Sequence, residues 1–507
     1  MKIGFRLDAG DEIGLGHFFR CLSIAEAFSV LGNEVYFLSR NLPAWLQEIA
    51  RGRGAGIAQI LSPSPNAGLR GDETILNRLS LGDSSQTLVV SKTLGLDLLV
   101  VDHYGIDQAW FTNVEKKGPR LLQIADFPAV SGGDFLLDYG FDASSAKHEI
   151  SENSAQVLLL GPKFAPISLP TWEARRGQSN ECGESVPEVA IALGSGVDLA
   201  CLRAIEREYL DSPRSFNLSL VTGDDSIEKT NSAGVRWVAS TDGLVRLFSQ
   251  SNFIVTSGGV SMYERIACGV PGAVVETAVN QRPALNEIRK EGLGGDTFYT
   301  LPEADPKTLI ETIDRGLSTG FDLAQRLLLQ STVDFFGPLR VAFALGAVPP
   351  PSALAARMFE PEDSSILLRW ANDENVRANS MSPEKISPEE HLRWQENLRS
   401  KGTRIWMFEY KGIPFGQVRF ELEHGKIFIS YSIDSLFRGL RLSFEMISSA
   451  IREASIGENI FARAKPANSA SIKILTRLGF YVLSSRDDVL ILMLPSEGDS
   501  KKGAVSR

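Results

Sequence analysis

Apolar and polar positions at the start of the chain predict a strand, a glycine-rich loop and a helix. Residues 2–7 are short and apolar-alternating, and residues 8–16 are rich in glycine. Apolar residues then recur at helical spacing until a Gly-Asn pair ends the helix. A second strand is predicted over 34–38, and a fully apolar one over 97–101 runs into polar residues, as buried parallel strands do. This pattern is typical of a doubly wound α/β fold.

The same pattern begins again in the middle of the chain. Residues 189–193 predict a strand, which is followed by a Gly-Ser-Gly turn and a helix from about Asp198. A later strand over 253–256 enters a second glycine turn and another helix. Two Rossmann-like halves are therefore expected, with a cleft between them.

A proline-rich connector separates these halves from a third region. Three consecutive prolines favour a stiff extended segment over a packed element. Beyond it we expect a tryptophan-rich helical segment over 366–398, strands at 405–410, 417–421 and 426–433, and a helix from about Leu442. The expected divisions are a first half at 1–170, a second half at 186–346, a linker at 347–355, an α+β domain at 356–495 and a polar tail at 496–507.

Composition narrows the classes of function. The 507 residues are 43% hydrophobic and 22% charged, which fits a globular chain of several domains. No run of eighteen apolar residues occurs, so we expect a cytoplasmic protein without a membrane partner. A net charge of −10 argues against nucleic acid. The four cysteines show no paired spacing, so neither a metal site nor a disulfide framework is expected.

The first glycine loop carries a candidate base. Ile13-Gly14-Leu15-Gly16-His17 lies between the first strand and the first helix, where free helix N–H groups favour an anion. The dinucleotide fingerprint fails because Phe19 occupies the place of its third glycine. His17 could therefore take a proton from water at the cleft. The alternative is a histidine that caps the helix or packs in the core.

Polar residues at two further strand ends are candidate ligand contacts. Asp102-His103-Tyr104 follows the apolar strand, although strand ends are often polar without any function. A second turn, Ser257-Gly258-Gly259-Val260-Ser261, precedes a helix and could cradle a diphosphate, whereas a tight turn would need only its glycines. Glu264, one turn later, could accept hydrogen bonds from ribose hydroxyls or be an ordinary surface glutamate.

Together these motifs resemble a known hydrolase family over residues 1 to about 345. "RLDAGDEIGLGHFFRCLSIAEAF", "LLVVDHYGID", "LLLGPKFAPI", "SGGVSMYERIACGVP" and "AVNQRPALNEI" are similar to the UDP-2,4-diacetamido-2,4,6-trideoxy-β-L-altropyranose hydrolase of pseudaminic acid biosynthesis. That family resembles the two-Rossmann (GT-B) glycosyltransferases. The resemblance implies that His17 is the general base for water attack, without a metal, and that the ligand is a UDP-linked amino sugar. The substrate-binding residues that it implies are Arg6, Asp8, Gly14, Gly16, Asp102, His103, Tyr104, Ser257, Gly258, Gly259, Val260, Ser261, Glu264, Asn280 and Gln281.

The last third resembles the GNAT acetyltransferases over about 356–495. "LRWANDENVRANS", "EEHLRW", "GQVRF", "FRGLRLS" and "NSASIKILTRLGF" carry this similarity. It implies that acetyl-CoA is a co-substrate and that the domain acetylates the 4-amino group of the UDP-sugar one step earlier in the same pathway. The implied coenzyme-binding residues are Arg438, Gly439, Leu440, Arg441, Leu442, Ser443, Asn468 and Ser471.

Two positions depart from the acetyltransferase pattern. Arg441 and Ser443 replace small residues of the R-x-x-G-x-G/A loop, so the arginine could obstruct the phosphate cradle or pair with the phosphates. Leu475 replaces the tyrosine that often protonates the departing thiolate. Trp370, Trp394 and His391 could line a sugar pocket or belong to the core. Two alternatives stay open: a UDP-sugar glycosyltransferase, and a sugar-nucleotide-binding protein with a degenerate acetyltransferase domain.

Overall fold

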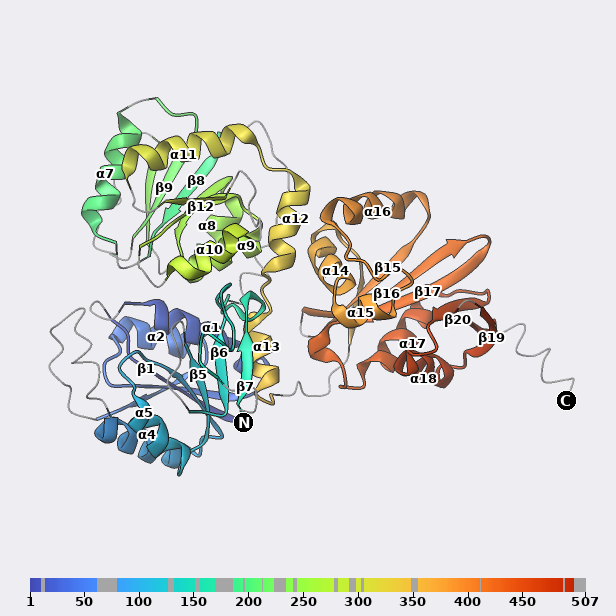
Figure 1. Ribbon diagram of the computed structural model, residues 1–507, viewed down its shortest axis with the longest axis horizontal. Helices are drawn as coiled ribbons and strands as arrows, with labels where there is room; N and C mark the ends of the chain where they lie inside the picture. Colours follow the sequence, from blue (N-terminus) through green and yellow to red (C-terminus); the bar gives the residue numbers. More distant parts are fainter. Residues whose placement is uncertain are drawn as a thin grey trace, which may run out of the picture. The chain divides into compact units, whose positions relative to one another are not determined.

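The computed structural model divides the chain into two compact units, Met1–Pro350 and Pro351–Arg507 (Figure 1). It describes all residues except 11–13, 62–79, 126–131, 151–155, 169–185, 195–196, 212, 223–233, 240–243, 278–280, 291–297, 302–304, 348–353, 411, 487 and 497–507. In this described part, no helix is long and apolar enough to cross a membrane.

The first half of unit 1 is built on a seven-stranded parallel sheet. In spatial order its strands are β3 (Gly56–Gln59), β2 (Glu34–Ser39), β1 (Lys2–Leu7), β4 (Leu98–Asp102), β5 (Arg120–Ile124), β6 (Phe135–Asp138) and β7 (Val157–Leu160). The helices are α1 (Gly16–Val30), α2 (Ala44–Gly52), α4 (Ser80–Leu94), α5 (Gln108–Glu115) and the short η1 (Pro162–Phe164). All five residues of β4 are buried because both faces of the sheet are covered.

The second half repeats this design with six parallel strands. In spatial order they are β10 (Val235–Ala239), β9 (Asn217–Thr222), β8 (Glu188–Ala192), β11 (Phe253–Ser257), β12 (Gly272–Val275) and β13 (Phe298–Leu301). Its helices are α7 (Leu199–Leu210), α8 (Leu244–Gln250), α9 (Val260–Cys268), α10 (Arg282–Lys290), α11 (Pro306–Thr319), α12 (Leu323–Thr332) and α13 (Gly337–Ala344). In both sheets the strand order reverses beside the first strand, so each half has a switch point where loops leave a crevice.

The last helix of unit 1 returns to the first half. Helix α13 packs against α1 and η1, and Figure 1 shows it beside the first sheet. Arg340 on α13 donates to the Lys163 carbonyl at 2.5 Å and pairs with Asp334. Arg120 after the first half's α5 donates to the Leu345 carbonyl at 3.1 Å. The segment that follows the second half therefore packs against the first half and links the two.

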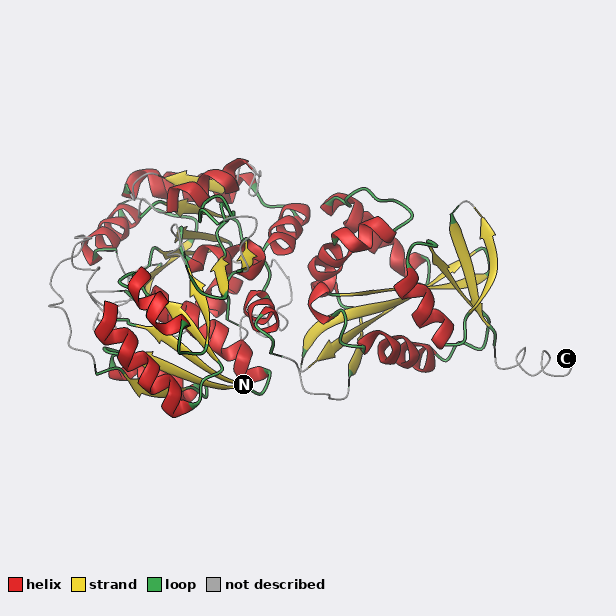
Figure 2. Cartoon of the chain, turned by 60° about the horizontal axis from the view of Figure 1, so that its bottom comes forward, coloured by secondary structure: helices red, strands yellow, loops and turns green. Residues whose placement is uncertain are grey.

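Unit 2 contains a mixed seven-stranded sheet. Its spatial order is β14 (Ala355–Met358), β15 (Arg404–Tyr410), β16 (Ile413–Glu423), β17 (Lys426–Ile433), β18 (Ile460–Ala464), β20 (Val489–Leu494) and β19 (Tyr481–Arg486). Its helices are η5 (Pro361–Asp363), α14 (Ser364–Ala371), α15 (Glu374–Asn379), α16 (Pro388–Ser400), η6 (Ser435–Phe437), α17 (Leu442–Ala454) and α18 (Ser469–Arg477), drawn red in Figure 2. Neighbouring strands are antiparallel except β17 and β18, which run parallel and pair at only three positions.

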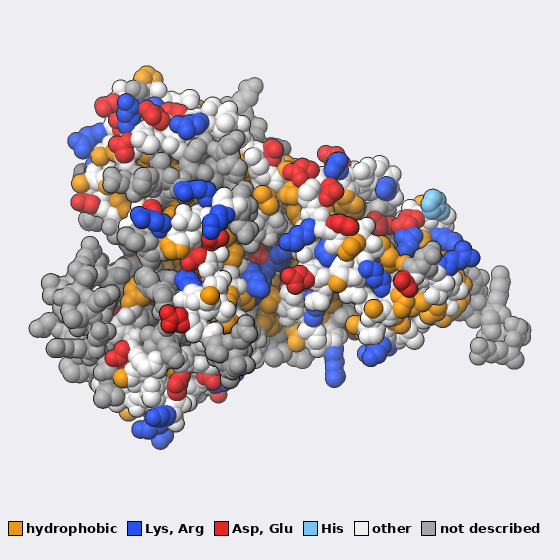
Figure 3. All heavy atoms as spheres, viewed as in Figure 1, with side chains coloured by type: hydrophobic (Ala, Val, Ile, Leu, Met, Phe, Trp, Pro, Cys, Tyr) orange, Lys and Arg blue, Asp and Glu red, His pale blue; other side chains and the backbone are white. Residues whose placement is uncertain are grey.

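The expected architecture is confirmed. Two Rossmann-like halves precede an α+β domain, and the strands predicted at 2–7, 405–410 and 426–433 form within one residue of those bounds. The helical segment expected over 366–398 is three helices, because the Asp373 side chain caps a new helix by accepting from Val376 N. On the face of the molecule in Figure 3, the coloured acidic and basic side chains are interspersed.

Candidate functional site

The switch point of the first sheet gathers the polar residues predicted at strand ends. Strands β1 and β4 are neighbours in this sheet, and Leu7 lies opposite Asp102. Asp8 follows β1, Asp102 ends β4 and His103 comes next, while His17 lies in the first turn of α1. Because parallel strands deliver their carboxyl ends to one edge, residues almost 100 positions apart meet there.

His17 is held by Asp102. The His17 Nδ1 lies 2.6 Å from Asp102 Oδ1, and both side chains are almost fully buried. Arg20, one turn after His17, contacts the same carboxylate through Nε and Nη2 at 2.5 Å each. Arg20 also donates to the Tyr139 hydroxyl at 3.1 Å. The carboxylate thus binds an imidazole and a guanidinium side by side.

The charges around Asp102 define what the imidazole can do. Burial alone would raise the pKa of Asp102, but Arg20 and His17 lower it well below the usual range. An ionised carboxylate accepts, so Nδ1 of His17 carries the proton and Nε2 is left with its lone pair. Among the residues that the structure describes, none is hydrogen-bonded to that Nε2. A carboxylate thus orients the imidazole, which is the arrangement that a histidine base requires.

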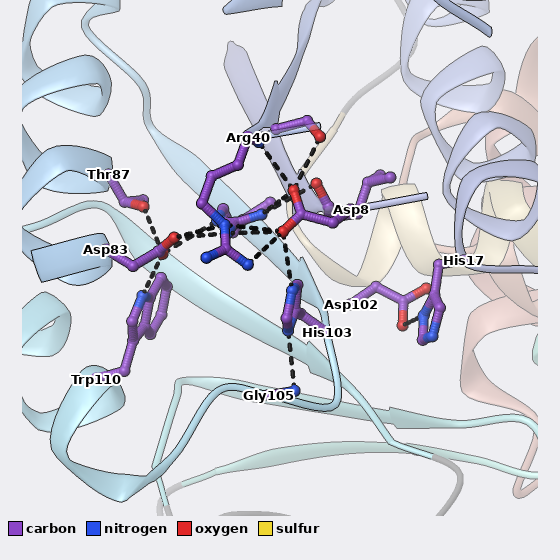
Figure 4. A network of polar contacts seen from close by, with 12 residues as sticks. Asp8, His17, Arg40, Asp83, Thr87, Asp102, His103, Gly105 and Trp110 are labelled. Carbon is purple, nitrogen blue, oxygen red and sulfur yellow. Dashed lines mark hydrogen bonds and ion pairs between the residues drawn. The ribbon is translucent and has the colours of Figure 1, made fainter. Parts of the chain in front are cut away.

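A second carboxylate organises the neighbouring loops, as Figure 4 shows. Asp8 accepts from Arg6 at 3.0 Å, from Ser39 Oγ at 2.9 Å, and from Arg40 Nη2 at 2.8 Å. Asp83 on α4 completes the network by binding Arg6 Nη2 at 2.6 Å. Burial alone would raise the pKa of Asp8, but its hydrogen bond with His103 and the nearby arginines hold it far below the usual range.

His103 belongs to this second network and is not a free base. Its Nδ1 accepts from Gly105 N at 2.9 Å, so its proton is on Nε2, which lies 3.1 Å from Asp8 Oδ2. Burial lowers the pKa of His103, which keeps the ring neutral. Both ring nitrogens are therefore occupied in fixing the loop after β4. Asp102 and His103 are adjacent in sequence but serve different networks.

The glycine loop and Tyr104 flank His17. Gly14 N donates to the Gly10 carbonyl at 2.7 Å, and both residues have positive φ angles. A Cβ added at Gly16 would meet no described atom within 4 Å. Tyr104 packs edge-on against the His17 ring, with 4.4 Å between ring centroids, while its side chain is about half exposed.

The second half presents the predicted diphosphate turn at its own switch point. Ser257 ends β11, and α9 begins at Val260 after Gly259, with no side-chain cap on its first N–H groups. Gly194, which follows β8, lies against Ser257, because a Cβ on Gly194 would meet Ser257 Oγ at 3.6 Å. Ser261 lies in the first turn of α9. Uncapped N–H groups at a helix start suit an anion.

Gln281 and Glu264 flank this turn in different ways. The Gln281 Oε1 accepts from Gly258 N at 3.3 Å and from Thr277 N at 3.0 Å, so its amide holds the turn in shape. Burial raises the pKa of Glu264 to about 7, and the residue as a whole is half-buried. Asn280 lies outside the described residues. A hollow of about 720 Å³ is lined by Asp142 of the first half and by residues of α10.

The two halves touch close to both features. Tyr263 on α9 packs against Tyr139 at 5.4 Å between ring centroids and stacks on Phe141 at 5.6 Å. Tyr139 is the residue whose hydroxyl accepts from Arg20. The helix of the predicted diphosphate turn is therefore linked to the carboxylate that holds His17 through two residues, Tyr139 and Arg20. Among the described residues, no group of three or more His, Cys, Asp or Glu side chains could hold a metal ion.

The loop before α17 contains most of the predicted coenzyme-binding residues. Gly439 and Arg441 have φ angles of +80° and +63°, so the arginine adopts the left-handed conformation that glycine usually provides. Leu440 lies between them, and Leu442 and Ser443 start the helix without a side-chain cap. Arg438 donates to Asp373 Oδ1 at 2.7 Å. The loop thus turns into α17 with the Arg441 side chain exposed, and its role in coenzyme binding stays a prediction.

The start of α18 holds the other two predicted coenzyme contacts. The Asn468 side chain caps the helix by accepting from Ser471 N at 3.1 Å. The Ser471 hydroxyl receives a hydrogen bond from Tyr431 of β17 at 2.9 Å. Leu475 lies one turn later and is buried. His391 is also buried, 5.0 Å from the Trp394 ring, and burial lowers its pKa to about 4.

Several residues in these networks escaped the motif analysis. Arg20 and Tyr139 contact the Asp102 cluster, and Arg40 and Asp83 complete the Asp8 network. Arg20 had a usable signal, since a residue at i+3 shares a helix face with His17. Arg40 follows β2 directly, so the strand-end rule could also have found it. Tyr139 follows β6 in the same way, whereas nothing local marks Asp83.

The comparisons with known proteins cover different parts of the chain. The family described as "Acetyltransferase (GNAT) domain" matches residues 354–481. Over 412 residues the chain is 19% identical to an uncharacterized protein of Methanocaldococcus jannaschii (MJ1062), covering 78% of each.

Two solved structures are similar to different parts of the chain. The glycosyltransferase SnogD of Streptomyces nogalater covers 69% of this chain and 100% of its own, with 17% identity and a TM-score of 0.43. The yncA protein of Salmonella typhimurium, solved with acetyl-CoA, covers 28% of this chain and 94% of its own, with 19% identity and a TM-score of 0.26. The family match shows that the C-terminal part of this chain is an acetyltransferase domain of the GNAT family.

Proposed function

We propose that residues 1–346 hydrolyse a UDP-linked amino sugar and that the C-terminal domain N-acetylates a UDP-linked 4-amino sugar with acetyl-CoA. The proposed substrate of the hydrolase is UDP-2,4-diacetamido-2,4,6-trideoxy-β-L-altropyranose, as the motif resemblance implies. The acetyl transfer would then supply this substrate, because it adds one of the two acetamido groups. A cytoplasmic location, and the domain bounds given above, remain predictions.

The observation that carries the hydrolase proposal is the contact of His17 with Asp102 at 2.6 Å. An ionised, buried carboxylate holds the imidazole so that Nε2 can accept a proton. Arg20 supports that role by keeping Asp102 ionised. A histidine that merely filled the core would not need two charged partners within hydrogen-bonding distance.

In the proposed reaction, His17 removes a proton from water as the water oxygen attacks the anomeric carbon. The bond between that carbon and the β-phosphate oxygen breaks, and UDP leaves with the electron pair. The uncapped start of α9 and the hydroxyls of Ser257 and Ser261 favour the negative charge on the leaving group. The protonated imidazole is stabilised by Asp102 and then returns its proton to solvent.

The acetyltransferase proposal rests on the family match and on the loop before α17. The left-handed conformation of Arg441 preserves the loop shape despite the missing glycine, and the exposed guanidinium can pair with phosphates. The backbone N–H groups at the start of α17 are the expected contacts for the coenzyme pyrophosphate. The amine of the sugar attacks the thioester carbonyl, and the coenzyme leaves as a thiol.

Phosphorus NMR tests the hydrolase directly. The purified chain is incubated in EDTA with the UDP-diacetamido sugar alone, and free UDP is expected to appear. His17→Ala should lower turnover by about 10²- to 10⁴-fold while UDP affinity, measured by calorimetry, stays within about twofold. The matched control is His424→Asn, since His424 lies in the β16–β17 turn with a φ of +47°, a conformation that asparagine tolerates.

The outcomes separate the alternatives. UDP released only after an acceptor alcohol is added would indicate a glycosyltransferase. No UDP from folded protein, with or without acceptor, together with UDP binding, would leave a sugar-nucleotide-binding protein. For the second activity, calorimetry with acetyl-CoA is the first step, and absence of binding at millimolar concentration rules out acetyl transfer.

A further inference from the structure

The acetyltransferase domain lacks an acid at the position where the resemblance expects one. Leu475 stands there, with a side chain that is only 1% exposed and cannot give up a proton. A thiolate leaving the acetyl group is a good proton acceptor, so an acid nearby speeds its departure. Another residue near the same helix face could supply that acid.

Tyr431 reaches this face from the strand side. Its hydroxyl donates to Ser471 Oγ at 2.9 Å. Ser471 and Leu475 are four residues apart on α18, so they lie one above the other on one face of the helix. The phenol therefore lies within one helical turn of the position where a tyrosine was expected.

The sheet opens at the same place. Strands β17 and β18 pair from Ile427 to Ile429 on one strand and from Ile460 to Ala462 on the other, and pairing stops there. Tyr431 lies two residues beyond the last pair on β17, while β17 continues to pair with β16 on its other side. Its side chain is half-buried, so it is neither sealed in the core nor fully in water.

Partial burial also keeps the phenol protonated. Burial raises the pKa of Tyr431, and the hydrogen bond to Ser471 offsets this only in part. A protonated phenol is the form that an acid requires. Leu475, Ser471 and Tyr431 together indicate that the acid has moved from the helix to the strand.

We propose that Tyr431 protonates the sulfur of coenzyme A as it leaves, in place of the residue missing at Leu475; this rests on the acetyl transfer proposed above. The amine nitrogen forms a bond to the acetyl carbon, and the carbon–sulfur bond then breaks. The electron pair goes to sulfur, which takes the proton of the Tyr431 hydroxyl. The nitrogen releases its proton to water, and the phenolate regains one from solvent through the Ser471 hydroxyl.

Tyr431→Phe removes one oxygen and tests the proposal. Release of free thiol from acetyl-CoA is followed with a thiol-reactive chromophore, using the UDP-linked 4-amino sugar as acceptor. We expect kcat to fall about 10²-fold with the KM for acetyl-CoA and the melting temperature unchanged. Tyr481→Phe is the matched control, because Tyr481 is about half exposed on β19 and has no assigned role.

A binding measurement separates contact with sulfur from a structural role. Coenzyme A and desulfo-coenzyme A are titrated into both proteins by calorimetry. Tyr431→Phe should weaken coenzyme A binding about threefold to tenfold, the usual effect of one hydrogen bond, and leave desulfo-coenzyme A unaffected. Equal weakening of both ligands would overturn the proposal.

The proposal and the function beneath it fail in different ways. If the native chain transfers acetyl groups and Tyr431→Phe works within twofold of it, the assignment of Tyr431 is wrong and the domain remains an acetyltransferase. If the native chain binds neither coenzyme, the proposed acetyl transfer is wrong and the role of Tyr431 is refuted with it.

Discussion

Replacing Asp102 with asparagine keeps the shape of the side chain and removes its charge. The native carboxylate accepts from His17 at 2.6 Å and from two nitrogens of Arg20 at 2.5 Å each. An asparagine offers one oxygen and one NH₂ group instead. Because Oδ1 accepts from both His17 Nδ1 and Arg20 Nη2, the amide oxygen should take that place, and the NH₂ group then faces Arg20 Nε.

The substitution acts on His17 through charge. The ring keeps its proton on Nδ1 but loses the negative charge that stabilises its protonated form. Loss of that charge beside a general base costs about 10²- to 10⁴-fold in rate. At the middle of that range, the barrier rises by about 4 kcal/mol.

Asp102→Asn also weakens the fold. Removing one partner of a buried ion pair costs about 3–5 kcal/mol. Arg20 keeps the Tyr139 hydroxyl and gains the amide oxygen, so we expect the lower end of this range. The unfolding midpoint in urea should drop, and assays belong well below the new melting temperature.

The assay is UDP release per folded molecule, measured beside an Asp97→Asn control. Asp97 accepts from Lys2 N at 2.8 Å at an exposed position and touches neither network. If Asp102→Asn retains more than a third of native activity per folded molecule, the Asp102 charge does not support His17 as a base. Equal losses of activity in Asp102→Asn and Asp97→Asn would refute that role too.

Two further predictions concern stability. The pKa of Asp8 is lowered in the folded state, so its charge stabilises the fold above the unfolded value near pH 4, and this contribution is lost as the pH falls below that. The urea concentration at the unfolding midpoint, measured between pH 7 and pH 2, should therefore decrease once the pH is below about 4. Asp8→Asn should be less stable than the native protein at pH 7, and its midpoint should decrease less at low pH. Gly272→Ala should cost about 1–3 kcal/mol, because its Cβ would lie 1.9 Å from the Ile254 carbonyl oxygen. Gly52→Ala, at the open end of α2, should instead be neutral or stabilising when both are compared by urea unfolding.

Strand ends could be predicted because their chemistry is local. The apolar run before Asp102 and the glycines before His17 predict a parallel strand and a helix start, and both residues lie where those elements place them. The pairing between them depends on β1 and β4 being neighbours. That adjacency comes from the strand order of the whole sheet, which no window of sequence contains.

The hydrogen-bond partners of two histidines and of one tyrosine could not be predicted from the sequence. His17 was predicted as the base and His103 as a substrate contact, but Gly105 N occupies Nδ1 of His103 and leaves it with a fixed proton. Leu475 departs from the acetyltransferase pattern, and the hydroxyl of Tyr431, on another element, contacts Ser471 one turn before it. In each case the deciding partner is a backbone amide or a residue on another element, which has no spacing signature.

The contact between α1 and α13 has a consequence during synthesis. Helix α1, with its buried Phe18, leaves the ribosome early, but α13, which packs on it, is made roughly 300 residues later. At about 5–20 residues per second this interval lasts roughly 15–60 s. Throughout that time the helix that carries His17 is without its final cover, so nascent chains of this protein should be a substrate for chaperones until residue 344 has emerged.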